Sequence, residues 1–89
     1  MAAEAYRIRG RVQGVGFRWW TRSQARRLDL VGTVRNCADG SVEVQASGPP
    51  ERIAEFHRLL TQGPPGAQVE AVEAFAPTAN LGETFEIVR

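Results

Sequence analysis

The sequence predicts an α+β sandwich in which one antiparallel sheet carries two helices on a single face. Apolar and polar residues alternate in runs typical of strands, two other segments have the apolar spacing of amphipathic helices, and turn-forming residues separate them. The predicted order is strand, helix, strand, strand, helix, strand, with a short extra strand at the C-terminus. Because 89 residues suffice for one hydrophobic core, we expect a single domain over residues 1–89.

The first strand is predicted over residues 5–12 and the first helix over residues 19–29. In the strand, Tyr6, Ile8 and Val12 alternate with arginines, so one face is expected to be buried and the other open to solvent. The outward arginines are Arg7, Arg9 and Arg11. The apolar stripe of the helix consists of Thr21, Ala25 and Leu28.

Two tryptophans, Trp19 and Trp20, open the predicted helix. Neighbouring side chains on a helix point about 100° apart, so at most one of the pair is expected to pack squarely into the core. We interpret both as partial packing at the start of the helix rather than as a grip on a ligand.

A hairpin is predicted next, with strands over residues 31–37 and 41–47. The dipeptide Asp39-Gly40 lies between them and is typical of tight hairpin turns. The two strands are therefore expected to be antiparallel neighbours. Alternation places four polar residues on the outward face of the second of these strands: Ser41, Glu43, Gln45 and Ser47.

The second half of the chain predicts another helix and two further strands. The helix follows a Gly-Pro-Pro break, has an apolar stripe of Ile53, Phe56 and Leu60, and ends near Thr61. A strand is predicted over residues 67–76 and a turn over residues 80–82. Phe85 and Ile87 mark a short last strand. Two strand–helix–strand units with right-handed crossovers then give the ferredoxin-like sandwich.

The loop between the first strand and the first helix is typical of an anion-binding site. Its glycines allow positive φ angles, so successive backbone N–H groups can converge on one point, and the helix start adds further unpaired N–H groups. Arg18 falls in the first turn, where its guanidinium can bind two oxygens of a phosphate. The expected phosphate-binding residues are Gln13, Gly14, Val15, Gly16, Phe17 and Arg18.

The distribution of charge supports an anionic ligand. Residues 1–36 contain eight arginines and two carboxylates, whereas residues 37–89 contain three arginines and eight carboxylates. A positive field around the first half would attract an anion.

Three other side chains are candidates for chemistry. Asn36 precedes the hairpin turn, where its carboxamide can either orient a water for attack on phosphorus or satisfy backbone groups of the turn, and its position leaves both readings open. His57 has no histidine or cysteine partner at metal-ligand spacing, so we assign it to packing and predict no metal site. Cys37 has no histidine placed to activate it and is interpreted as an inert thiol.

A nucleic-acid-binding module is the competing interpretation, because RNA-recognition domains share this topology and stack bases on aromatic residues of the open sheet face. The outward positions of the first and third strands hold no aromatic residue, and Glu43 would repel phosphate. We therefore expect no nucleic-acid partner.

Sequence features bear on the compartment as well. No segment approaches the unbroken apolar run of a membrane helix, and the N-terminal residues lack the pattern of a secretory signal. The single cysteine cannot form an intrachain disulfide, which fits a reducing compartment. We expect a cytoplasmic monomer without a membrane partner.

Three motifs resemble the acylphosphatase family: Gly-Arg-Val-Gln-Gly-Val-Gly-Phe-Arg at residues 10–18, Gly-Thr-Val-Arg-Asn at residues 32–36 and Asp-Gly-Ser-Val-Glu at residues 39–43. The resemblance runs over essentially the whole chain. It implies hydrolysis of a small-molecule acyl phosphate to a carboxylate and inorganic phosphate, without a cofactor or a metal ion.

The resemblance also implies roles for individual residues. Arg18 matches the phosphate-binding arginine of the family, the amides of residues 13–18 match its phosphate loop, and Asn36 matches the asparagine that orients the attacking water. The chain departs from the family at Asp29, where glycine is frequent and ends the first helix in a left-handed turn. We expect a small cost in stability there rather than a changed activity.

Overall fold

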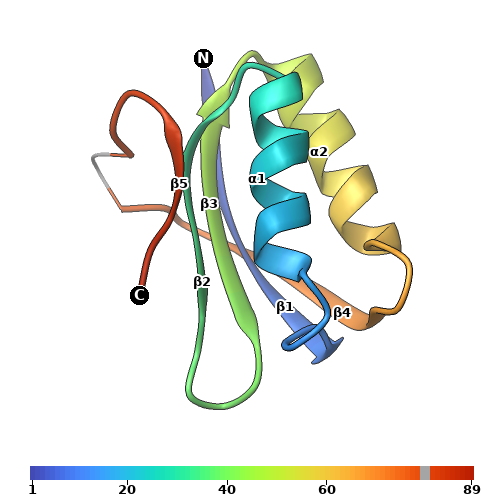
Figure 1. Ribbon diagram of the computed structural model, residues 1–89. Coiled ribbons are helices and arrows are strands. Elements are labelled where there is room, and N and C mark those ends of the chain that lie inside the picture. The colour runs from blue at the N-terminus through green and yellow to red at the C-terminus, as the bar shows by residue number, and fades with distance from the viewer. Residues whose placement is uncertain (79–80) are drawn as a thin grey trace.

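The computed structural model describes residues 1–78 and 81–89. It contains five strands and two helices in the predicted order (Figure 1). The elements are β1 (Ala2–Arg11), α1 (Phe17–Arg27), β2 (Val31–Asn36), β3 (Val42–Gly48), α2 (Pro50–Gln62), β4 (Gln68–Phe75) and β5 (Phe85–Ile87). Both helices cover the same face of the sheet, which confirms the predicted ferredoxin-like sandwich with an added C-terminal strand. The turn predicted over residues 80–82 lies partly outside the described residues.

The strands form one sheet in the order β4-β1-β3-β2-β5. β1 pairs with both β3 and β4, and β2 pairs with β3, all antiparallel as predicted. β5 pairs with β2 in parallel, so the complete sheet is mixed. In the register of the central strands, Val42 of β3 lies between Ile8 of β1 and Asn36 of β2. This row fixes the position of Asn36, the last residue of β2, relative to Ile8 in β1.

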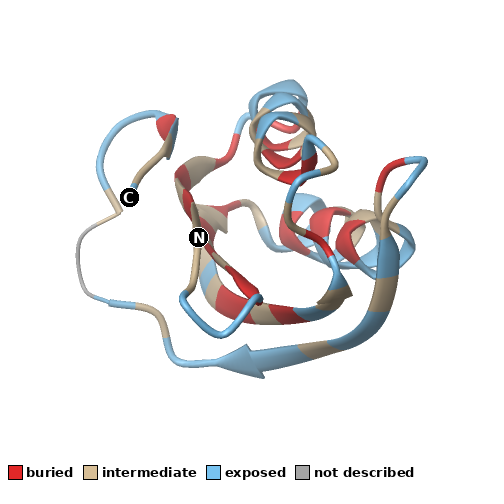
Figure 2. Cartoon of the chain, turned by 60° about the horizontal axis from the view of Figure 1, so that its bottom comes forward, coloured by how far each residue is buried: buried red, intermediate tan, exposed pale blue. Residues whose placement is uncertain are grey.

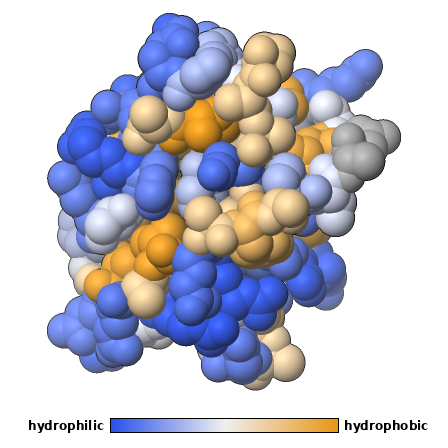
Figure 3. Space-filling model, turned by 180° about the vertical axis from the view of Figure 1, so that it is seen from behind, coloured by the Kyte–Doolittle hydropathy of each residue, from blue (hydrophilic) through white to orange (hydrophobic). Residues whose placement is uncertain are grey.

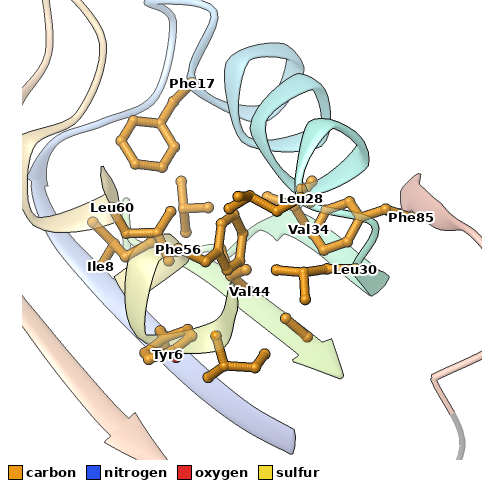
Figure 4. Packing of buried hydrophobic residues seen from close by; sticks show 14 of the residues in the cluster. Tyr6, Ile8, Phe17, Leu28, Leu30, Val34, Val44, Phe56, Leu60 and Phe85 are labelled. Atoms are coloured by element: carbon orange, nitrogen blue, oxygen red, sulfur yellow. The ribbon is translucent and has the colours of Figure 1, made fainter. Parts of the chain in front are cut away.

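The hydrophobic core lies between the sheet and the two helices. Figure 2 shows buried residues alternating along the strands and gathered on the helix sides that face them. The predicted stripes of both helices are buried: Thr21, Ala25 and Leu28 in and after α1, and Ile53, Phe56 and Leu60 in α2. In Figure 4, Phe56 lies at the centre of the core, and its ring meets those of Tyr6 and Phe85 edge to face.

The first helix begins two residues earlier than predicted, at Phe17. The Phe17 side chain is buried and extends the stripe of Thr21 and Ala25 by one turn, so its packing holds the helix start against the core. Trp20 packs partly against the same cluster, whereas Trp19 is 61% exposed and stacks with Arg22 at 4.6 Å. Packing of only one tryptophan agrees with the prediction.

The first helix also ends two residues earlier, at Arg27, because Asp29 adopts a φ of 58°. The N–H of Leu30 donates to the Ala25 carbonyl at 2.9 Å, and the N–H of Asp29 donates to the Arg26 carbonyl at 3.1 Å. These bonds form a Schellman motif, in which a left-handed residue closes the helix. Glycine adopts this conformation without steric cost, and an acidic side chain is unfavourable at a helix C-terminus.

Asp29→Gly is therefore expected to raise the free energy of unfolding by about 0.5–1 kcal/mol, because the strain relieved exceeds the entropy that glycine adds to the unfolded chain. Urea denaturation followed by circular dichroism measures the change. Asp29→Asn is the control, since it removes the charge and retains a side chain that tolerates this region. An unchanged or lower midpoint for Asp29→Gly would contradict the expectation.

The sheet face opposite the helices is partly covered. Residues 76–78 run from β4 onto this face, where the backbone N–H and the hydroxyl of Thr78 donate to Gln45 Oε1 at 2.8 and 3.0 Å. Ala5 is fully buried there. Figure 3 shows this face from outside, with hydrophilic side chains interrupted by apolar patches. The prediction of a face open to solvent is therefore wrong at this end of the sheet.

The predicted outward position of Ser41 is also wrong, since Ser41 precedes β3 and is 2% exposed. Its N–H and hydroxyl both donate to Asp39 Oδ1, at 3.0 and 2.6 Å. These bonds, followed by the Arg9 guanidinium, lower the pKa of Asp39 to about 2. Ser41 therefore belongs to the turn and not to the surface of the strand.

Candidate functional site

The sequence-predicted residues meet at one edge of the sheet. β1 and β2 are both antiparallel to β3, so they run parallel to each other and their C-terminal ends reach the same edge. The loop over residues 12–16 follows β1, α1 begins directly after it, and Asn36 is the last residue of β2 (Figure 1).

The loop owes its shape to Gly14 and Gly16. Both have a φ of 76°, which favours glycine, and an added Cβ would meet no other atom within 4 Å at either position. These glycines therefore serve backbone conformation and leave the space beside the loop open. Within residues 1–78 and 81–89, no carbonyl or side chain accepts a hydrogen bond from the N–H groups of residues 13–18.

The positive end of the α1 helix dipole is not compensated by any side chain of the N-cap or the first turn. Gly16 is its N-cap and supplies no side-chain acceptor, and the first turn contains no acidic residue. A helix N-terminus is normally stabilised by Ser or Asp at the N-cap, or by Asp or Glu in the first turn. Without them, the exposed N–H groups and the helix dipole remain available to an external anion.

Arg18 lies in this first turn and is half-buried. It has no ion pair or hydrogen bond in the part of the chain that the structure describes. Several other arginines are paired with carboxylates across the sheet: Arg7 with Asp39 and Glu43, Arg9 with Asp39 and Glu73, and Arg35 with Glu43. Part of the charge excess of the first half is thus neutralised, while the Arg18 guanidinium remains available to an anion.

Asn36 projects toward the helix layer, since it follows buried Val34 by two positions in β2. Its Oδ1 atom is buried and has no hydrogen-bond partner among the described residues. A buried acceptor without a partner costs about 1–3 kcal/mol. The carboxamide does not satisfy the turn backbone, which was one reading of its position; Asp39 and Gln13 bond that backbone instead.

The side chain of Gln13 joins the loop to the hairpin. Its Nε2 atom donates to the carbonyls of Cys37 and Ser41, at 2.8 and 2.9 Å. Sequence reasoning assigned Gln13 only a backbone contribution and missed these bonds. No pattern signals them, because backbone carbonyls are present at every residue.

The remaining candidates lie outside this arrangement or take part only through the backbone. The exposed ring of His57 stacks on Tyr6 with centroids 5.1 Å apart. The Cys37 side chain is a half-buried free thiol. The backbone N–H of Cys37 donates to the Ser41 carbonyl at 2.8 Å. Surface depressions of about 490 and 350 Å³ lie at the far end of α1 and beside β5, and none of the predicted site residues lines them.

Metal-ligand clusters of three or more His, Cys, Asp or Glu residues are absent from the described ranges 1–78 and 81–89. Metal independence stays a prediction for experiment. Neither helix in the described part of the chain is long and apolar enough to cross a membrane.

Comparisons with known proteins converge on one family. The sequence profile of the acylphosphatase family matches residues 4–87. Proteins named acylphosphatase are 48% identical in Synechococcus, over 92% of this chain and 70% of that protein, and 46% identical in Salinibacter ruber, over 93% and 88%. The crystal structure of acylphosphatase from Bacillus subtilis matches with a TM-score of 0.94 and 32% identity, and the match covers 100% of both chains.

Proposed function

Because this chain belongs to the acylphosphatase family and thus hydrolyses acyl phosphates, we propose that residues 13–18 and Asn36 form its active site. One observation carries the assignment. Three groups lie at the same sheet edge without a hydrogen-bond partner among the described residues: the N–H groups of the loop, the Arg18 guanidinium and Asn36 Oδ1. This arrangement supports a site in which donors for an anion lie near an acceptor for a water.

The N–H groups of residues 13–18 and the Arg18 guanidinium bind the substrate phosphate. Fixed donors of this kind need no reorganisation as charge redistributes over the phosphoryl oxygens, so they stabilise the transition state. The open space beside Gly14 and Gly16 lets the phosphate approach the backbone closely.

Asn36 Oδ1 accepts a hydrogen bond from the attacking water and holds it in line with the bond that breaks. The water oxygen bonds to phosphorus as the bond from phosphorus to the acyl oxygen breaks, which yields a carboxylate and inorganic phosphate. The phosphate itself takes the proton of the water. Because a carboxylic acid has a pKa of about 4, the carboxylate leaves at neutral pH without a general acid.

The sheet face opposite the helices does not support the alternative function, binding of nucleic acid. Arg7, Arg9 and Glu43, which occupy the central outward positions of β1 and β3, are engaged in ion pairs. Gln45, further along β3, is bonded to Thr78. Cytoplasmic location and a monomeric state stay predictions.

The direct test follows hydrolysis of benzoyl phosphate by the purified protein, with and without EDTA. We expect turnover, competitive inhibition by inorganic phosphate, and less than a two-fold change on chelation. Folded protein without turnover would overturn the proposed function. Turnover lost with EDTA and restored by a divalent cation would overturn the metal-free site.

A further inference from the structure

We propose that the Gln13 side chain is a positioning residue that fixes the hairpin carrying Asn36 to the phosphate loop. The inference rests on the proposed function, since it assumes that the loop binds phosphate and that Asn36 orients water. It assigns to Gln13 a second task beside the contribution of its backbone N–H group.

The carboxamide of Gln13 uses both of its N–H bonds on the hairpin. Its two acceptors, the carbonyls of Cys37 and Ser41, flank the turn at 2.8 and 2.9 Å. The same residues close the hairpin, because the Cys37 N–H donates to the Ser41 carbonyl, and the Cys37 carbonyl also accepts from the Gly40 N–H. Gln13 therefore holds both sides of the turn. Asn36 directly precedes Cys37, so a bond that fixes Cys37 also restricts Asn36.

No other hydrogen bond in the described part of the chain joins residues 12–18 to residues 36–41. Strand pairing from Ile8 through Val42 to Asn36 fixes β1 and β2 relative to each other. However, β1 ends at Arg11, before the phosphate loop begins. Beyond that point, the distance between the phosphate loop and Asn36 depends on packing and on Gln13.

Position matters strongly in this reaction, because the site contains neither a general acid nor an activated nucleophile. A displacement of about 1 Å between a reacting water and its target can cost about 100-fold in rate. Loss of the Gln13 bonds should therefore reduce the contribution of Asn36 to kcat far more than it reduces the affinity for phosphate.

The test is a double-mutant cycle with Gln13→Met and Asn36→Ala, in which kcat for benzoyl phosphate and inhibition by phosphate are measured. Gln13→Met keeps the length of the side chain and removes both donors. We expect it to lower kcat about 10- to 100-fold when Asn36 is present and less than three-fold in the Asn36→Ala background. Phosphate inhibition should change less than five-fold in each case.

Gln45→Met is the matched control. Gln45 also makes two hydrogen bonds through its carboxamide, but on the sheet face away from the loop. Its replacement should leave kcat within two-fold, and urea midpoints of the two methionine variants separate a general loss of stability from a loss of position.

A second variant keeps the proposal testable if Gln13→Met folds poorly. In Gln13→Glu, the ionised carboxylate cannot donate to the two carbonyls, whereas the protonated form can donate to one. We expect kcat relative to wild type to rise as the pH falls toward about 4, the usual pKa of a glutamate side chain. A ratio that does not change with pH would contradict the positioning role.

Equal losses of kcat from Gln13→Met with and without Asn36 would overturn the inference while leaving the proposed function intact. If Asn36→Ala alone left kcat unchanged, the proposed role of Asn36 would fail instead. The two failures are therefore distinguishable in one set of measurements.

Discussion

Arg18→Ala is expected to lower kcat/KM for benzoyl phosphate by about 10³-fold or more and to abolish inhibition by inorganic phosphate. The guanidinium is the one cationic side chain in the first turn of α1, where it meets the phosphate proposed to bind the loop. Removal of a single transition-state donor commonly costs about 10²–10³-fold, and loss of an arginine at a transferring phosphoryl group costs about 10³–10⁵-fold.

The fold should tolerate this change. Arg18 is without a hydrogen bond or ion pair in the described residues, so we expect its removal to alter the free energy of unfolding by less than about 0.5 kcal/mol. Arg22→Ala is the matched control, because Arg22 lies one turn later in the same helix and stacks on Trp19. Retained turnover in Arg18→Ala, or an equal loss in Arg22→Ala, would remove Arg18 from the mechanism.

Asn36→Ala is expected to lower kcat by about 10²–10³-fold, whereas inhibition by phosphate should change less than five-fold. The carboxamide is proposed to hold the water and not the phosphate, so its loss affects the transition state alone. The same substitution should raise the free energy of unfolding by about 1 kcal/mol, because it removes a buried acceptor that has no partner in the described part of the chain.

Steady-state kinetics, phosphate inhibition and urea denaturation measure these three effects separately. Cys37→Ala serves as the neighbouring control, since the hydrogen bonds of Cys37 run through its backbone. A parallel loss of kcat, phosphate binding and stability in Asn36→Ala would indicate a structural role instead.

Periodicity was sufficient to predict the elements and their order, because burial of one face imposes a period of two on strands and 3.6 on helices. It misplaced the start of α1, since Phe17 was assigned to the loop although it continues the spacing of Thr21 and Ala25. The left-handed φ of Gly16 permits the helix to begin directly after the loop, and a sequence does not state the φ angle that a glycine adopts.

Side-chain pairing across the sheet was not predictable, because it depends on register. The register places Glu43 between Arg7 and Arg35, and this neutralises charges that composition alone assigned to a ligand. The loop and Arg18 were predicted from the glycines and the helix start, and Asn36 from the family resemblance, and their roles stay predictions. The Gln13 bonds and the parallel pairing of β5 were missed because neither has a pattern of residue types.

The central place of β3 has a consequence for how the protein acquires activity. The phosphate loop follows β1 and Asn36 ends β2, and within the sheet β3 lies between these two strands, as the row of Ile8, Val42 and Asn36 shows. The pairing of β2 with β3 is a local hairpin, but the pairing of β1 with β3 joins segments distant in the chain, and such pairings form more slowly than local contacts. During refolding, the helices can therefore form well before hydrolysis begins, and the first turnover marks completion of the sheet.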